Sequence, residues 1–177
     1  MYHIKADIRM YRSADKVLSA LTVCLKSKPF SAVTFTDLQK ASGVGRSTIY
    51  RLFDTTADIL AYGCDSFAEK VNDRYKDLTK NEEPSKRDVA LFVFESLSSE
   101  HELLNAIMGS RREDLLARSM QKCKHYLVEE DEDVKVKYHK AVAAAALGAI
   151  FRVWLLNGRK ETPEELLGIM EDIVRGT

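Results

Sequence analysis

Two arginines and three hydroxyl side chains are crowded into one six-residue segment of this 177-residue chain. An arginine guanidinium can donate two hydrogen bonds to one guanine base, and serine, threonine and tyrosine hydroxyl groups can donate to phosphate oxygens. Such side chains on one exposed helix face can bind double-stranded DNA. The five residues are Arg46, Ser47, Thr48, Tyr50 and Arg51. Any solvent-exposed helix also carries polar residues, so their spacing alone leaves both interpretations open.

The residues around this segment predict two short helices joined by a tight turn. Thr34, followed three residues later by Asp37, is typical of a capping box and starts a helix at Phe35. Gly43 ends this helix, because glycine takes the left-handed conformation at a helix end without steric cost. A second helix is predicted over residues 46–52. Two short helices joined by a glycine-containing turn form a helix-turn-helix.

Helical spacing divides this segment into a buried and an exposed side. The residues predicted to share one small core are Leu38, Ala41, Val44, Ile49, Leu52 and Phe53. The polar residues of the second helix then face outward at its N-terminal end, the end of a recognition helix that enters the major groove. The predicted DNA-binding set is Thr34, Thr36, Arg46, Ser47, Thr48, Tyr50 and Arg51.

The segment from Thr34 to Leu60, together with Val33, resembles the N-terminal signature of the TetR family of bacterial transcriptional regulators. The matching residues are Val33, Thr34, Asp37, Leu38, Ser42, Gly43, Val44, Arg46, Ser47, Thr48, Ile49, Tyr50 and Phe53. The resemblance implies a ligand-responsive repressor that binds a palindromic operator as a homodimer. It also implies a double-stranded DNA partner and a small-molecule effector of unknown identity.

Two residues depart from the family pattern, and one motif points to a particular branch. Gly45 stands where the family usually has a serine cap, and Thr56 stands where it usually has a lysine expected to hold a DNA phosphate. Residues 28–30, Lys-Pro-Phe, resemble a branch that includes a coactivator of dihydroxyacetone kinase expression. The alternative function is therefore a partner-binding transcriptional coactivator, in which protein contacts rather than ligand-driven DNA release carry the regulation.

Composition and charge fit a packed helical protein with a basic N-terminal part. The apolar fraction is 45%, with only eight glycines and three prolines. Residues 1–63 hold nine Lys and Arg against five Asp and Glu, whereas the remainder holds 18 against 22. Three widely spaced cysteines and an N-terminus without the apolar core of a signal peptide favour a cytoplasmic protein without a membrane partner.

The remaining sequence predicts helices throughout and no strands. After the two short helices, the next expected helix is a long one that begins at a capping box formed by Thr55 and Asp58. The approximate ranges of this and the following helices are 55–79, 85–98, 101–108, 113–129, 141–156 and 162–174, preceded at the N-terminus by a helix over 8–27. Gly109 and Ser110 are expected to break the chain. The predicted class is all-α with about nine helices: residues 1–55 a helix-turn-helix domain, residues 56–177 a helical ligand-binding and dimerisation domain.

The sequence contains no arrangement typical of an enzyme or a metal centre. Its four histidines are scattered, and no Ser-His-Asp order or glycine-rich phosphate loop is present. Five consecutive acids at 129–133 lack the spacing of a calcium loop and are interpreted as a solvated segment. We therefore expect no catalytic activity, no metal and no cofactor.

The last two helices carry the prediction of a dimer. The first is rich in alanine and apolar on nearly every side, and an all-round apolar helix must be buried on nearly every side. The TetR resemblance implies that these two helices form a four-helix interface between subunits. The interface residues predicted on this basis are Ala141, Ala145, Gly148, Trp154, Leu166, Ile169, Met170 and Ile173. Residues that either line an effector pocket or form ordinary core are Phe67, Phe92, Phe94, Met108, Tyr126 and Phe151.

Overall fold

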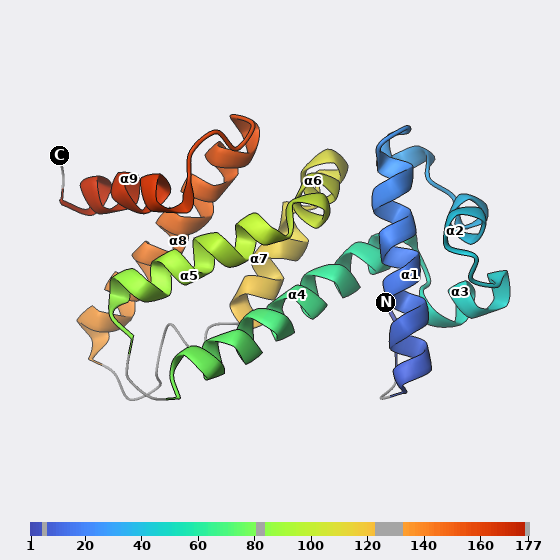
Figure 1. The fold of residues 1–177 in the computed structure, drawn as a ribbon, viewed down its shortest axis with the longest axis horizontal. Coiled ribbons are helices and arrows are strands. Elements are labelled where there is room, and N and C mark those ends of the chain that lie inside the picture. Colours follow the sequence, from blue (N-terminus) through green and yellow to red (C-terminus); the bar gives the residue numbers. More distant parts are fainter. Residues whose placement is uncertain (5–6, 81–83, 123–132, 176–177) are drawn as a thin grey trace. The chain divides into compact units, whose positions relative to one another are not determined.

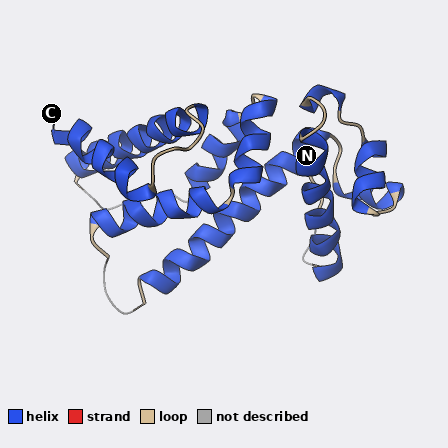
Figure 2. Cartoon of the chain, turned by 45° about the horizontal axis from the view of Figure 1, so that its top comes forward, coloured by secondary structure: helices blue, strands red, loops and turns tan. Residues whose placement is uncertain are grey.

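The computed structural model describes residues 1–4, 7–80, 84–122 and 133–175 (Figure 1). These residues form nine α-helices and a short 3-10 helix. Figure 2 shows the helices joined by loops. One isolated antiparallel β-bridge joins Tyr2 and Phe53. The predicted all-α class and helix number are therefore confirmed. The elements are α1 (Ile8–Leu25), η1 (Phe30–Ala32), α2 (Phe35–Ser42), α3 (Arg46–Leu52), α4 (Thr56–Leu78), α5 (Lys86–Ser99), α6 (His101–Ser110), α7 (Glu113–Lys122), α8 (Val134–Leu156) and α9 (Pro163–Arg175).

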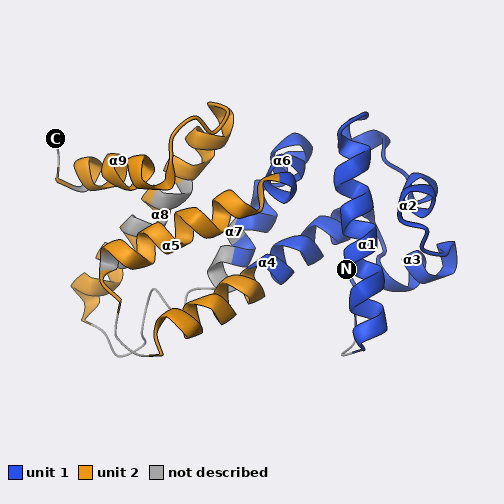
Figure 3. Cartoon of the chain, in the orientation of Figure 1, with its two compact units in different colours: residues 1–67, 102–119 blue, residues 68–101, 120–177 orange. Residues whose placement is uncertain are grey.

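The chain divides into two compact units, each built from two separate stretches of sequence (Figure 3). Unit 1 contains residues 1–67 and 102–119, and unit 2 contains residues 68–101 and 120–177. Helix α4 begins in unit 1 and ends in unit 2. The predicted boundary after residue 55, between a helix-turn-helix domain and a ligand-binding and dimerisation domain, stays a prediction.

Unit 1 is organised around α1, which packs against both α2 and α3. Asp7 caps the start of α1 by accepting a hydrogen bond of 2.8 Å from the backbone N–H of Arg9. The helix ends at Leu25, two residues before the predicted end. Its buried side chains recur every three or four residues, so one apolar stripe faces the core. They are Ala14, Val17, Ala20, Leu21 and Cys24.

Three helices begin at the capping boxes that the sequence predicts. Each pairs a threonine or serine hydroxyl with a backbone N–H three residues later, while the aspartate there accepts from the backbone N–H of the first residue. The pairs are Thr34–Asp37 before α2, Thr55–Asp58 before α4 and Ser85–Asp88 before α5. These helix starts are therefore set by local sequence.

The prediction that Gly109 and Ser110 break the chain is wrong. Helix α6 continues through both residues, and the chain turns at Arg111, whose φ of 56° lies in the left-handed region. The backbone N–H of Arg112 then donates to the carbonyl of Ile107 at 3.1 Å, closing the helix end. A glycine inside a helix costs only about 1 kcal/mol relative to alanine, so Gly109 does not by itself stop α6.

Unit 2 contains α9 packed against α5 and α8. An ion pair between Arg87 of α5 and Glu171 of α9 joins the first two of these helices. The indole N–H of Trp154 donates to the carbonyl of Glu161 at 2.9 Å, which ties the end of α8 to the loop before α9. Helix α8 ends at Leu156, and Gly158 follows with a φ of 78°, so the helix closes at this glycine as predicted. No helix among the described residues combines the length and apolar character that a membrane span requires.

Candidate nucleic-acid interface

The turn between α2 and α3 has the geometry expected of a helix-turn-helix. Gly43 adopts a φ of 68° and its backbone N–H donates to the carbonyl of Gln39 at 3.0 Å, so α2 ends there. Val44 is buried beneath the turn, and Gly45 begins α3 without a side-chain cap. The predicted bounds of α3, residues 46–52, agree with the structure. The turn therefore holds two short helices in a fixed relation.

The core beneath α2 and α3 contains five of the six predicted residues. Leu38, Val44, Ile49, Leu52 and Phe53 are buried. The sixth prediction, Ala41, is wrong because its side chain is exposed. Leu38 is the one residue of α2 that is buried, so this eight-residue helix packs on the core mainly through that side chain.

The polar residues of α3 face solvent along the helix, from its first residue, Arg46, to Arg51 in its last turn. Arg46, Ser47 and Arg51 are exposed and Tyr50 is half exposed, whereas Thr48 is partly covered. Thr34 and Thr36 are exposed at the start of α2. Their roles in DNA binding stay predictions, but the side chains are accessible to a phosphate backbone or a groove.

An aromatic contact joins the start of α2 to the C-terminal half of α3. The Phe35 ring packs edge-on against the Tyr50 ring with centroids 4.9 Å apart. The Arg46 guanidinium lies over the same tyrosine ring, 5.4 Å from its centroid, and donates to the Tyr50 hydroxyl at 3.3 Å. A cation over an exposed aromatic ring is stabilised by about 0.5–1 kcal/mol. Tyr50 therefore limits the directions in which Arg46 can point.

The Lys-Pro-Phe motif at residues 28–30 contributes to the start of α2. The Lys28 ammonium lies 2.9 Å from an Asp37 carboxylate oxygen, and Pro29 precedes η1. Hydrogen bonds from Lys28 and then from Thr34 hold the pKa of the Asp37 carboxyl well below its usual range. The capping box of α2 therefore stays ionised at neutral pH, where its negative charge also suits the positive end of the helix.

The cysteines that the structure describes are unsuited to redox chemistry. Cys24 and Cys64 are free and buried, and burial raises the pKa of both thiols, that of Cys64 to about 12. A protonated thiol is a poor nucleophile, so neither residue is activated for oxidation. Among the described residues, no cluster of three or more histidine, cysteine, aspartate or glutamate side chains could hold a metal ion.

The residues predicted to line an effector pocket are distributed over both units. Phe67 is buried and Met108 is partly covered in unit 1, while Phe92, Phe94 and Phe151 are buried in unit 2. Tyr126 lies outside the described residues. These positions suit ordinary core as well as a pocket lining, and the pocket stays a prediction.

The residues predicted to form a dimer interface differ in exposure. Ala141, Ala145, Ile169 and Ile173 are exposed and Met170 is partly covered. Trp154 and Leu166 are instead buried inside unit 2. Gly148 lies on α8. The exposed members leave an apolar surface on α8 and α9 of the isolated chain.

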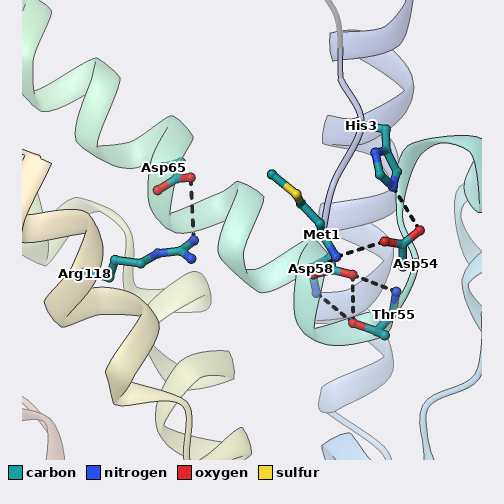
Figure 4. Close-up of polar contacts among 7 residues, drawn as sticks. All are labelled: Met1, His3, Asp54, Thr55, Asp58, Asp65 and Arg118. Carbon is teal, nitrogen blue, oxygen red and sulfur yellow. Dashed lines mark hydrogen bonds and ion pairs between the residues drawn. The ribbon is translucent and has the colours of Figure 1, made fainter.

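One group of contacts beside α3 is absent from the sequence-based prediction. Residues 1–3 pair with residues 52–54, which follow directly from the end of α3. The Met1 ammonium and the His3 imidazole both contact Asp54, each at 3.0 Å (Figure 4). No local pattern in the sequence marks this pairing, because its partners are some fifty residues apart and one of them is the chain's α-amino group. Arg9 and Arg12, which follow this segment in the sequence and belong to α1, are exposed.

One family model matches the N-terminal part of the chain. Residues 17–62 match the model of the bacterial regulatory proteins of the tetR family. No curated protein matches the chain in sequence. The match runs from the second half of α1 to the first turns of α4 and includes the whole helix-turn-helix.

Solved structures resemble the chain along nearly its whole length. Lin0861 from Listeria innocua superposes with a TM-score of 0.74 at 12% identity, covering 98% of this chain and 94% of that one. The fatty acid degradation regulator FadR from Bacillus halodurans gives 0.66 at 14% identity, covering 96% of both chains. A proposed transcriptional regulator from Pseudomonas aeruginosa PAO1 gives 0.68 at 16% identity, covering 97% and 95%. At these identities the likeness shows the fold. Over residues 17–62, the chain is therefore similar to the helix-turn-helix domain of the tetR family of bacterial regulatory proteins.

Proposed function

We propose that the chain is a transcriptional repressor that binds a palindromic DNA operator as a homodimer and releases it when a small molecule binds. The observation that carries the proposal is the exposure of Arg46 and Ser47 at the start of α3, with Tyr50 and Arg51 exposed further along the same helix. A recognition helix reads base edges with its N-terminal residues. The excess of basic residues in the first 63 positions supports the same assignment.

Within this proposal, the side chains divide into base-reading and phosphate-binding groups. Arg46 reads a base, because a guanidinium can donate two hydrogen bonds to guanine. Ser47, Thr34 and Thr36 hold phosphate oxygens and fix the position of the protein on the duplex. Tyr50 either binds a phosphate through its hydroxyl or orients Arg46 through the contact between their side chains.

The homodimer is supported by an apolar stripe along α8. Its exposed members recur every three or four residues, the spacing of one helix face. They are Tyr138, Val142, Ala145, Ala149, Val153 and Leu156. Val142 and Leu156 are 66% and 67% exposed, so this face is uncovered on the single chain. A two-fold axis at α8 and α9 would present two copies of α3 to DNA half-sites about 34–36 Å apart or more.

Release by an effector is proposed as a population shift. A small molecule that binds the helical body more tightly in one conformation favours that conformation by its difference in affinity. If the favoured conformation no longer spaces the two α3 helices to fit the operator, DNA is released. The predicted lining residues, which include Phe92 and Phe151, do not specify a chemical class of effector.

The DNA-binding part is tested by selecting bound fragments from random-sequence DNA and then measuring their affinity. We expect an enriched palindrome, and we expect Arg46→Ala to lose discrimination at one base pair of each half-site. Arg111→Ala removes the same charge from the exposed turn before α7 and should bind normally. Failure to enrich any sequence, or equal losses in the two variants, would contradict base reading by α3.

The dimer is tested by sedimentation of an Ala145→Glu variant. A carboxylate placed in the exposed stripe of α8 would be buried without a partner in the proposed dimer, so monomers are expected. Asn105→Glu adds the same charge at an exposed position of α6 and should leave the dimer intact. A dimer that survives Ala145→Glu would mean that the interface lies elsewhere.

A further inference from the structure

Residues 1–3, which we call the N-terminal strap, lie antiparallel to the segment that follows α3. The backbone N–H of His3 donates to the carbonyl of Leu52 at 2.8 Å, and the N–H of Asp54 donates to the carbonyl of Met1 at 3.4 Å. Leu52 is the last residue of α3. The strap therefore supplies backbone partners where the helix ends, at the opposite end of α3 from Arg46.

The first anchor of the strap is the α-amino group of Met1. Its nitrogen lies 2.8 Å from an Asp58 carboxylate oxygen and 3.0 Å from one of Asp54 (Figure 4). Hydrogen bonds to Asp58 and then Asp54 raise the pKa of the amine above its ordinary value of 8.0. Asp58 also caps α4 through Thr55, so one carboxylate links the strap to the start of the next helix.

The second anchor is the Tyr2 side chain. Its hydroxyl donates to an Asp65 carboxylate oxygen at 2.7 Å, and its ring packs edge-on against Tyr62 with centroids 5.7 Å apart. Asp65 is 5% exposed and lies 3.9 Å from the Arg118 guanidinium of α7. A hydrogen bond to a buried, charged acceptor is stronger than one to a neutral exposed group, so this anchor holds the strap firmly.

We propose that the N-terminal strap is a positioning element of the DNA-reading helix, which fixes the C-terminal end of α3 through the Met1 α-amino group and the Tyr2 hydroxyl. The strap's backbone hydrogen bond to α3 is at Leu52, the last residue of the helix, so the strap acts through the helix and needs no contact with DNA. The inference rests on the proposed function, since α3 must read DNA for its position to affect affinity. Losing either anchor would let α3 occupy orientations that do not fit the groove, and apparent affinity falls with the fraction of fitting protein.

The test compares three forms of the full chain with wild type. N-terminal acetylation removes the charge of the amine, whereas Tyr2→Phe removes only a hydroxyl. Tyr11→Phe removes a hydroxyl from an exposed tyrosine of α1 and serves as the control. Operator affinity, affinity for random DNA and the salt dependence of both are measured at a temperature where circular dichroism shows all four proteins folded.

We expect acetylation and Tyr2→Phe each to weaken operator binding about three- to tenfold, with little change for random DNA. The slope of affinity against salt should stay unchanged, because neither anchor contacts a phosphate. In an Asp54→Asn background, acetylation should have a smaller effect, since one partner of the amine is already altered. A merely structural role would lower stability without changing the ratio of operator to random affinity. An unchanged ratio, or a salt slope reduced by about one, would overturn the positioning role.

Hydrogen exchange of the protein alone separates this inference from the proposed function. The amides of His3 and Asp54 donate to backbone carbonyls and should be protected in wild type. Acetylation and Tyr2→Phe should speed their exchange and that of the last turn of α3, whereas Tyr11→Phe should not. Equal exchange in all forms would refute the strap even if the protein binds its operator. Faster exchange without any DNA binding would refute the proposed function and the positioning role together.

Discussion

Substitution of Gly63 by alanine tests the packing of α4 in unit 1. A methyl group there would lie 2.9 Å from Cδ1 of Leu103 and 3.0 Å and 3.2 Å from the two Cδ atoms of Leu18. Gly63 is buried within α4, so alanine gains about 1 kcal/mol of helix propensity. Forcing an extra carbon into a filled core costs about 1–3 kcal/mol. We therefore expect Gly63→Ala to be neutral or to destabilise the protein by up to about 2 kcal/mol.

Gly168→Ala in α9 is the matched comparison, because a methyl group there meets no heavy atom within 4 Å. This variant should gain the propensity term alone, about 1 kcal/mol. Urea unfolding at one fixed protein concentration should separate the two midpoints by about 0.5–1.5 M, taking a slope of about 2 kcal/mol per M. If Gly63→Ala stabilises the protein as much as Gly168→Ala, the close packing of Leu18 and Leu103 on α4 would be refuted.

Four further predictions concern the interface and its supports. Arg46→Ala should cost about 1–3 kcal/mol of operator affinity, measured by titration. Tyr50→Phe should reduce affinity only at the base that Arg46 reads if Tyr50 orients that arginine, whereas it should reduce affinity for all sequences if the Tyr50 hydroxyl holds a phosphate. Gly45→Ser should add a cap to α3 and raise the free energy of unfolding by about 0.5–1 kcal/mol, seen as a higher Tm, because a Cβ atom at this position meets no heavy atom within 4 Å. Thermal melts should show the strap's contribution to stability between about pH 4 and 8. The pKa of the Met1 amine is raised, so its contribution is lost as the pH rises above this range, and the pKa of Asp54 is lowered, so its contribution is lost as the pH falls below it.

The helix-turn-helix was predictable because its signals are local. A hydroxyl and a carboxylate three residues apart start α2, α4 and α5, and a glycine in the left-handed region ends α2. The exposed side chains of α3 follow from helical spacing once these ends are placed. Buried Leu38 and Ile49 follow from the same spacing.

The errors and omissions come from tertiary structure. Ala41 fits the apolar spacing of α2, but its exposure depends on how far α1 and α3 extend over that short helix. The turn after α6 uses Arg111, a residue type that seldom adopts a positive φ, while nearby Gly109 stays helical. The strap joins residues 1–3 to residues 52–54, and no periodicity within either segment indicates this pairing.

The central claim is that α3 reads a specific DNA site, and footprinting tests it most directly. Purified protein is mixed with DNA flanking its own gene at two salt concentrations, and cleavage protection is mapped along both strands. We predict a protected, roughly palindromic site with half-sites at least about 34–36 Å apart, whose occupancy falls steeply between the two salt concentrations. Absence of a specific footprint even at low salt would contradict the account and favour a regulator that acts through a protein partner.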